Sequence, residues 1–222
     1  MNIAENINTL KAELPETVKI IPISKRQPEE RLQEAYDAGQ RIFGENKAQE
    51  LQERFEKFPK DIEWHFVGHL QRNKVKYIVP FVKMIHSVDS LRLLRKINQE
   101  AEKNERSIDC LLQLHIADEE SKFGLSCEKA EEILQSDDYK KMQHIRIIGL
   151  MAMATNTDDT DKVRKEFKTL KACFDRLKEK YFADKDYFKE ISAGMTNDYP
   201  IAVEEGSTMI RVGSLIFGER QY

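Results

Sequence analysis

The sequence predicts a single (β/α)8 barrel, an α/β fold in which eight parallel strands alternate with helices. Short apolar segments and amphipathic helical patterns alternate from one end of the chain to the other, which indicates repeated strand–helix units. The chain has 222 residues, and a barrel of this kind occupies roughly 200 to 250 residues. No linker, repeat or low-complexity segment divides the sequence. We therefore expect one domain that spans residues 1–222.

Eight short segments have the composition of buried strands. Each is a mostly apolar run bounded by turn-forming or polar residues, as expected for parallel strands covered on both faces. In chain order, the predicted strands are residues 18–24, 41–44, 62–67, 83–88, 109–116, 145–151, 188–192 and 209–213. An open doubly wound sheet is the competing architecture. It predicts a glycine-rich loop after the first strand, where this chain has Ser24-Lys25-Arg26.

Helical patterns precede the first strand and fill the intervals between strands. The predicted helices are an opening helix with Ile3, Ile7, Leu10 and Leu14 on one face, a helix from Pro28 to Gly39, a helix with Ala48, Leu51, Phe55 and Phe58 on one face, a short helix before Pro80, and helices at 91–101, 127–134, 163–181 and 200–205. The helix at 163–181 is the longest, and the three–four spacing of its apolar residues predicts that one face packs on the core.

Charge and composition exclude several classes of function. Hydrophobic residues make up 40% and charged residues 34% of the chain, and the formal net charge is −3. Because basic and acidic residues are interspersed, we expect no nucleic-acid partner. No segment has the ~20 apolar residues that a membrane-spanning helix needs, so we expect no membrane association. The first 15 residues lack a long apolar run, so we expect no signal peptide and a cytoplasmic protein.

The cysteines and histidines do not form a recognisable metal motif. Cys110, Cys127 and Cys173 have no paired spacing, so we expect no disulfide and a reducing compartment. His65 and His69 lie close together in the sequence, but no further ligands accompany them at metal-binding spacing. We expect no metal, and we expect His65 to pack or hydrogen-bond in the interior.

Polar groups and glycines follow almost every predicted strand. Active sites of such barrels lie at the carboxyl ends of the strands, so this pattern predicts a small polar ligand in the barrel mouth. Lys25 follows the almost wholly apolar segment 18–23. Burial at such a position disfavours the charged form of an amine, which suits a lysine that attacks a carbonyl group. The alternative is a lysine that extends from the barrel rim into solvent.

Two clusters near the end of the chain predict a phosphate site. Residues 192–196 read Ser-Ala-Gly-Met-Thr after the seventh strand, and residues 211–214 read Arg-Val-Gly-Ser in the eighth. Loops after these two strands often bind phosphate, because glycines let N–H groups approach the oxygens and hydroxyls add donors. Ordinary turn chemistry is the alternative. Arg211 needs a partner, either a carboxylate such as Asp198 or Glu204, or a ring nitrogen or phosphate of a ligand.

An ordered set of motifs resembles the pyridoxal phosphate homeostasis proteins. The motifs are Ile23-Ser24-Lys25, Gly44-Glu45-Asn46, residues 64–74 (Trp-His-Phe-Val-Gly-His-Leu-Gln-Arg-Asn-Lys), Val88-Asp89-Ser90, Ser121-Lys122-Phe123-Gly124, Gly149-Leu150-Met151, residues 192–198 and residues 206–218. Together they span nearly the whole chain, from about residue 18 to residue 220.

The resemblance implies a barrel like the N-terminal domain of alanine racemase, with pyridoxal 5′-phosphate (PLP) as the cofactor. Lys25 would attach PLP covalently as a Schiff base, and Asn46 would lie near its ring. Ser192, Thr196, Gly213 and Ser214 would hold its phosphate group. Arg211 would face the pyridine nitrogen, and Met195 and Met209 would pack near the ring or the phosphate loop.

The resemblance favours a protein that stores, buffers or delivers PLP over an enzyme. An arginine facing the pyridine nitrogen keeps that nitrogen unprotonated, which weakens the ring as an electron sink. The chain also leaves no room for the second domain of alanine racemases, so we expect a monomer. PLP-dependent apoenzymes are the expected recipients. Two alternatives remain open, an amino-acid racemase with Lys25 as a base, and a barrel enzyme that binds another phosphorylated metabolite.

Overall fold

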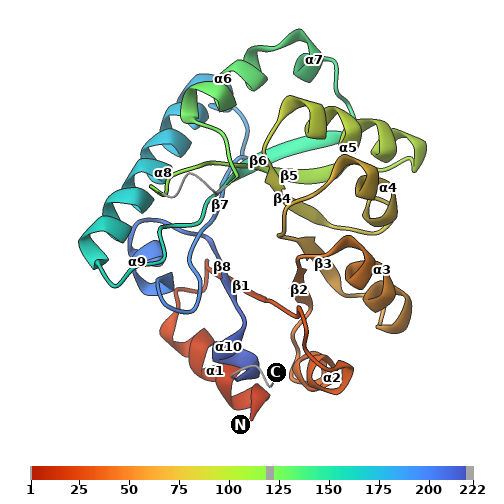
Figure 1. The fold of residues 1–222 in the computed structure, drawn as a ribbon, viewed down its shortest axis with the longest axis vertical. Helices are drawn as coiled ribbons and strands as arrows, with labels where there is room; N and C mark the ends of the chain where they lie inside the picture. Colours follow the sequence, from red (N-terminus) through yellow and green to blue (C-terminus); the bar gives the residue numbers. More distant parts are fainter. Residues whose placement is uncertain (1, 119–122, 219–222) are drawn as a thin grey trace.

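The computed structural model describes residues 2–118 and 123–218, and at its centre eight parallel strands lie side by side (Figure 1). They are β1 (Lys19–Pro22), β2 (Ile42–Glu45), β3 (Glu63–Phe66), β4 (Met84–Val88), β5 (Ile108–Gln113), β6 (Ile145–Met151), β7 (Glu190–Ser192) and β8 (Met209–Val212). Their order is β1-β8-β7-β6-β5-β4-β3-β2. An isolated parallel bridge between Ile23 and Gly44 joins β1 to β2 and nearly closes the barrel. The predicted fold class is confirmed.

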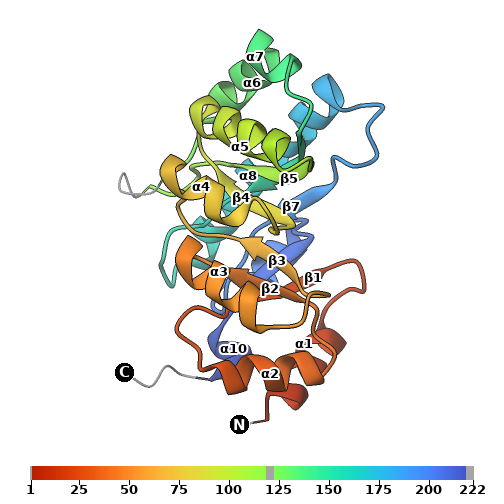
Figure 2. The same cartoon turned by 90° about the vertical axis from the view of Figure 1, so that its right-hand side faces the viewer.

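Helices cover the outside of the strands. They are α1 (Ile3–Glu13), α2 (Glu29–Asp37), α3 (Ala48–Lys57), the 3-10 helix η1 (Arg72–Lys74), α4 (Val75–Ile78), α5 (Leu91–Lys103), α6 (Cys127–Gln135), α7 (Asp137–Lys140), α8 (Thr160–Tyr181), α9 (Tyr199–Glu204) and α10 (Ser214–Phe217). Figure 2 shows α2, α3, α4 and α5 following one another along one side of the barrel. The first and last helices meet where Asn6 Nδ2 donates to the carbonyl oxygen of Ile216 at 2.9 Å.

Side chains of the strands pack in two layers, because successive residues of a strand point to opposite faces. The larger cluster fills the space between strands and helices and includes Phe43, Trp64 and Leu94. The smaller cluster lies inside the barrel and consists of Ile21, Met84, Leu111, Ile148, Met151 and Met209. The barrel interior is therefore a packed core, as in other barrels of this kind.

Most element boundaries differ from the predicted ones by a few residues. β6 has the predicted limits, whereas the fifth strand ends at Gln113 and not at residue 116. Helices α7 and α10 were not predicted, since each has only 4 residues and too few positions to show a helical period. Ser121 and Lys122 of the quoted motifs lie outside the described residues.

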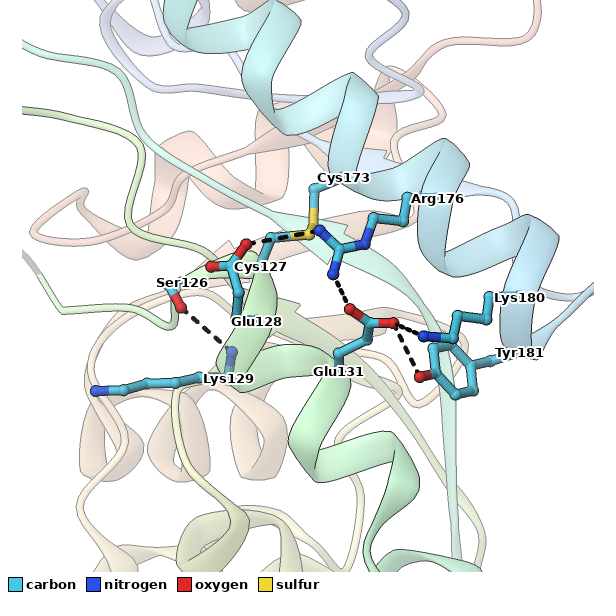
Figure 3. Close-up of a disulfide and its surroundings, with 9 residues drawn as sticks. All are labelled: Ser126, Cys127, Glu128, Lys129, Glu131, Cys173, Arg176, Lys180 and Tyr181. Atoms are coloured by element: carbon cyan, nitrogen blue, oxygen red, sulfur yellow. Dashed lines mark hydrogen bonds and ion pairs between the residues drawn. A yellow bond between two sulfur atoms is a disulfide. The ribbon is translucent and has the colours of Figure 1, made fainter.

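The prediction that the cysteines form no disulfide is wrong for Cys127 and Cys173 (Figure 3). These residues are 46 positions apart, but α6 and α8 bring their Cα atoms to 5.9 Å. Spacing along the chain could not reveal this pair, because the helix packing creates it. Cys110 is a buried free thiol. The inference of a reducing compartment loses its support from cysteine usage.

An ion cluster around the buried Glu131 carboxylate lies beside the disulfide and also joins α6 to α8. Figure 3 shows the Glu131 carboxylate contacting Arg176 and Lys180, and it accepts from Tyr181 Oη at 3.0 Å. Lys180 first, and then Tyr181 and Arg176, lower the pKa of Glu131 to about 2. The long helix α8 is thus fixed to its neighbour by a covalent bond and by a cluster of charges.

Candidate functional site

A cavity of about 580 Å³ opens at the carboxyl ends of β1, β6, β7 and β8. Of the nine predicted ligand-binding residues, six contribute to its lining: Lys25, Met195, Thr196, Arg211, Gly213 and Ser214. Ser192 and Met209 are fully buried behind it, and Met209 belongs to the cluster inside the barrel. Asn46 lies on the neighbouring strand end, outside the lining. The contact of each residue with a ligand stays a prediction.

A tight turn after β1 presents Lys25. The backbone N–H of Gln27 donates to the carbonyl oxygen of Ser24 at 3.0 Å, so Lys25 and Arg26 occupy the centre of the turn. Arg26 has a φ of 59°, a left-handed conformation that is uncommon outside glycine and asparagine. Ser24 N–H donates to Gly44 O at 3.0 Å, which ties the turn to β2. Lys25 is half-buried in the cavity wall.

The loops after β7 and β8 bring two hydroxyl groups together. Thr196 Oγ1 and Ser214 Oγ are 3.1 Å apart, although the residues are 18 positions apart in the chain. Gly194 starts the first loop with a φ of +93°, and its carbonyl oxygen accepts from Arg211 N–H at 2.9 Å. A Cβ atom on Gly213 would meet nothing closer than 3.6 Å, so the backbone there is open to approach. Paired hydroxyls beside an accessible backbone suit an anion such as phosphate.

Arg211 is buried and is held by neutral acceptors. Its Nη1 donates to Ser192 Oγ at 2.7 Å, and its Nη2 donates to the carbonyl oxygen of Ala152 at 2.9 Å. Burial lowers the pKa of Arg211 to about 10, against the opposing effect of Asp198, so the guanidinium stays charged at neutral pH. Glu204 pairs instead with Arg164, at 2.5 Å, so the alternative of a Glu204–Arg211 pair is wrong.

Two buried histidines extend the contacts of Arg211 through the barrel. His86 Nδ1 lies 2.8 Å from Ser192 Oγ, and His86 Nε2 lies 3.0 Å from His65 Nδ1. Burial lowers the pKa of both, to about 3 for His65, so both imidazoles are neutral. His65 was predicted to be an interior hydrogen-bonding residue, and it is. His86 was missed, although a histidine in the middle of an apolar strand is a signal for a buried polar contact.

Asn46 presents an unsatisfied acceptor at the end of β2. Its backbone N–H donates to Glu45 Oε1 at 2.9 Å, but its side-chain Oδ1 is buried without a hydrogen-bond partner among the described residues. An unpaired buried acceptor costs roughly 1–3 kcal/mol. A donor from a bound molecule would remove that cost, so this atom fits the predicted position of Asn46 near a ligand.

The loop after β6 contributes cavity residues that the sequence did not single out. Thr155, Asn156, Thr157 and Asp158 all belong to the lining. Glu166 of α8 holds this loop, since its carboxylate accepts from Thr155 N–H at 2.7 Å and from Thr155 Oγ1 at 2.6 Å. Four consecutive polar residues soon after the apolar segment of β6 were the available signal.

The described part of the chain shows neither a metal cluster nor a membrane span. Within residues 2–118 and 123–218, no three histidine, cysteine, aspartate or glutamate side chains gather closely enough to hold a metal ion. No helix in these ranges is both long enough and apolar enough to cross a bilayer.

The chain matches a known family along nearly its whole length. The family model of the alanine racemase N-terminal domain matches residues 1–221. A pyridoxal phosphate homeostasis protein from Aquifex aeolicus is 35% identical over 205 residues, which cover 92% of this chain and 88% of the relative. One from Helicobacter pylori is 36% identical over 206 residues, covering 91% and 88%.

Solved structures agree with this match. PipY from Synechococcus elongatus, solved with PLP bound, superposes with a TM-score of 0.87 at 34% identity, covering 97% of this chain and 100% of PipY. An alanine racemase from Clostridium difficile has a TM-score of 0.75 at 17% identity, covering 100% of this chain and 56% of the racemase, and shows a shared fold. The chain therefore belongs to the pyridoxal phosphate homeostasis protein family, whose barrel is that of the alanine racemase N-terminal domain.

Proposed function

We propose that this chain binds PLP in the cavity at the mouth of the barrel, with Lys25 as the covalent anchor, and serves PLP homeostasis by storing, buffering or delivering the cofactor. One observation carries the proposal. A lysine amine, a pair of hydroxyls and a buried guanidinium, from three different strand ends, line the same cavity. The PLP-bound structure of PipY and the names of the relatives support it.

The residues of the cavity fit the chemical groups of PLP. PLP supplies an aldehyde that condenses with primary amines and a pyridine ring that withdraws electrons. Lys25 offers the amine, and Thr196 and Ser214 offer donors to the phosphate group. Arg211 stays protonated and can only donate, so it would leave the pyridine nitrogen unprotonated. Asn46 lies outside the cavity lining, and its Oδ1, which has no donor among the described residues, is available to the ligand.

The proposed role is binding and not amino-acid catalysis. A ring whose nitrogen is unprotonated stabilises a carbanion poorly, so Arg211 works against racemase chemistry. We further propose that the protein acts as a monomer and passes PLP to PLP-dependent apoenzymes. Steady-state conversion of L-alanine to D-alanine tests whether the protein lacks amino-acid catalysis. Turnover at rates typical of an enzyme, on the order of 10 s⁻¹, would replace the binding role with a racemase.

Reductive trapping tests the anchor directly. The protein is incubated with PLP, reduced with borohydride, digested with trypsin and mapped by mass spectrometry. The peptide of residues 20–26 should carry the label at Lys25, because a modified lysine resists cleavage. Lys25→Ala should lose the label and keep weaker, noncovalent binding. A wild-type protein that folds normally and leaves this peptide unlabelled would overturn the proposal, and so would a label that persists in Lys25→Ala.

A further inference from the structure

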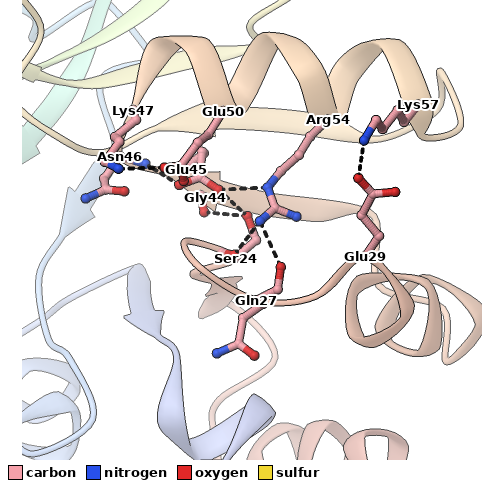
Figure 4. A network of polar contacts seen from close by, with 10 residues as sticks. All are labelled: Ser24, Gln27, Glu29, Gly44, Glu45, Asn46, Lys47, Glu50, Arg54 and Lys57. Carbon is pink, nitrogen blue, oxygen red and sulfur yellow. Dashed lines mark hydrogen bonds and ion pairs between the residues drawn. The ribbon is translucent and has the colours of Figure 1, made fainter. Parts of the chain in front are cut away.

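A buried ion pair contacts Ser24 and Gln27, the two ends of the turn that carries Lys25 (Figure 4). Glu45, at the end of β2, is 0% exposed, and Arg54, on α3, is 8% exposed. Arg54 Nε lies 3.1 Å from Glu45 Oε2. Removing two charges from water is costly unless further hydrogen bonds satisfy their remaining donors and acceptors. The hydrogen-bond partners of these two side chains therefore indicate which part of the structure the ion pair stabilises.

Most of the further hydrogen bonds of the pair go to the Lys25 turn. Arg54 Nη2 donates to the carbonyl oxygen of Ser24 at 3.0 Å and to that of Gln27 at 3.1 Å. Glu45 Oε2 accepts from Ser24 Oγ at 2.9 Å. The two carbonyl groups stand immediately before and after Lys25 and Arg26. The ion pair is thus hydrogen-bonded to the turn at both of its ends, as Figure 4 shows.

The same carboxylate also fixes the neighbouring strand end. Glu45 Oε1 accepts from the backbone N–H of Asn46 at 2.9 Å. This support matters because, among the described residues, the backbones of β1 and β2 pair through the isolated Ile23–Gly44 bridge rather than through a full ladder. Burial raises the pKa of Glu45, so the fold keeps a carboxylate where burial opposes its charge.

We propose that Arg54 and Glu45 are positioning residues for Lys25, which hold its turn so that Nζ is presented to the aldehyde of PLP. The inference rests on the proposed function. In the step concerned, Lys25 Nζ forms a double bond to the aldehyde carbon, and the aldehyde oxygen leaves as water with two protons from nitrogen. Neither Arg54 nor Glu45 takes part in that exchange. They set the angle and distance at which the nitrogen meets the carbon.

Two variants separate positioning from folding. Arg54→Lys keeps a positive charge beside Glu45, but a single ammonium nitrogen replaces Nε, which contacts Glu45, and Nη2, which bonds both carbonyl groups. Ser24→Ala removes the hydroxyl bond to Glu45 and leaves the ion pair intact, so it keeps the test open if Arg54→Lys does not fold. Lys57→Gln is the matched control. Lys57 lies on the same helix and bonds Glu29 on the surface, without touching the turn (Figure 4).

Two measurements are made on each folded variant. The first is the rate of covalent labelling by PLP, quenched with borohydride. The second is the Kd for pyridoxine 5′-phosphate, which keeps the ring and phosphate of PLP but has no aldehyde. Labelling should slow about tenfold or more in Arg54→Lys, because small misplacements of a reacting group cost this much. Ser24→Ala should show a smaller loss. The Kd for pyridoxine 5′-phosphate should stay within about twofold of wild type.

Three results bear on the inference in different ways. Unchanged labelling in both turn variants overturns it. A parallel loss of labelling and of pyridoxine 5′-phosphate affinity also overturns it, because that is the signature of general damage to the cavity. Slowed labelling with retained affinity, absent in Lys57→Gln, supports it. A wild-type protein that does not label at Lys25 is a failure of the proposed function, and it is seen before any variant is compared.

Discussion

Buried polar residues at the barrel axis form one ordered chain, Arg211–Ser192–His86–His65. Arg211 can only donate, so Ser192 Oγ accepts from it, and the serine proton is then available to His86 Nδ1 at 2.8 Å. His86 in turn donates from Nε2 to His65 Nδ1. This assignment, inferred from the network, leaves His65 with its proton on Nε2, a buried atom without a partner among the described residues. The permanent charge of Arg211 thus determines which ring nitrogen carries the proton in both His86 and His65.

The neutral histidines make stability depend on pH. An unfolded histidine has a pKa of about 6.5, whereas that of His65 in the fold is about 3. Between these values the unfolded state binds more protons, so the free energy of unfolding falls as the pH falls, by roughly 1 kcal/mol per pH unit from this residue. Urea unfolding at a series of pH values measures the slope.

A leucine at position 65 isolates this contribution. His65→Leu should flatten the pH dependence between about pH 6 and pH 4 and leave the slope above about pH 8 unchanged, where neither state of the histidine titrates. Equal slopes in the two proteins across the acid range would mean that His65 is not the source.

At the scale of elements, the loop between β7 and α9 depends on Gly194. A Cβ atom there would lie 2.8 Å from Ala202 Cβ and 2.9 Å from Tyr199 Cα, and the φ of +93° is itself unfavourable for other residues. Gly194→Ala should displace the loop that carries Thr196 and weaken pyridoxine 5′-phosphate binding about tenfold, the loss expected when one charge-assisted hydrogen bond to the phosphate is removed. Isothermal calorimetry measures this change.

Gly39 provides the matched control for this substitution. It has a φ of +89° and nothing within 4 Å of an added Cβ atom. Gly39→Ala should therefore introduce a similar backbone strain, about 1 kcal/mol, and leave the affinity for pyridoxine 5′-phosphate unchanged. The same loss of affinity in both variants would show that global strain, and not the β7–α9 loop, controls binding.

The disulfide between α6 and α8 should stabilise the fold. It closes a loop with a sequence separation of 46 residues. Limiting the unfolded chain in this way is worth up to about 4 kcal/mol. Cys127→Ala with Cys173→Ala should therefore lower Tm by roughly 10 °C in differential scanning calorimetry without reductant. The wild type in reductant should show the same drop. No drop in either case would mean that helix packing and the Glu131 cluster already fix the two helices.

The sequence predicted elements better than contacts. Each strand is a local apolar run, so its existence was visible, and the motif residues that follow the strands placed Lys25, Thr196, Arg211 and Ser214 at one mouth. The Ser192–Arg211 bond and the disulfide were not visible, because each joins side chains that only the finished packing brings together. Met209 belongs to the cluster inside the barrel, and its expected packing near the ligand stays a prediction.

The whole molecule has one continuous outer core. The cluster between strands and helices includes Ile3 of α1, Leu94 of α5 and Ile216 of α10, so elements from both ends of the described chain share it. We therefore expect one cooperative unfolding transition, with calorimetric and van't Hoff enthalpies in a ratio of about one. Two resolved calorimetric transitions would contradict the prediction of a single domain.

The barrel is closed unevenly around its circumference. Among the described residues, four registered pairs join β1 to β8, one registered pair joins β7 to β8, and the junction of β1 with β2 has one isolated bridge. Lys25 follows β1 on one side of this junction, and Asn46 follows β2 on the other, with an Oδ1 that has no partner among the described residues. A molecule bonded to both residues would add a connection between the ends of β1 and β2. Binding the cofactor would then also link β1 to β2, and the barrel without cofactor would be held less tightly at this junction.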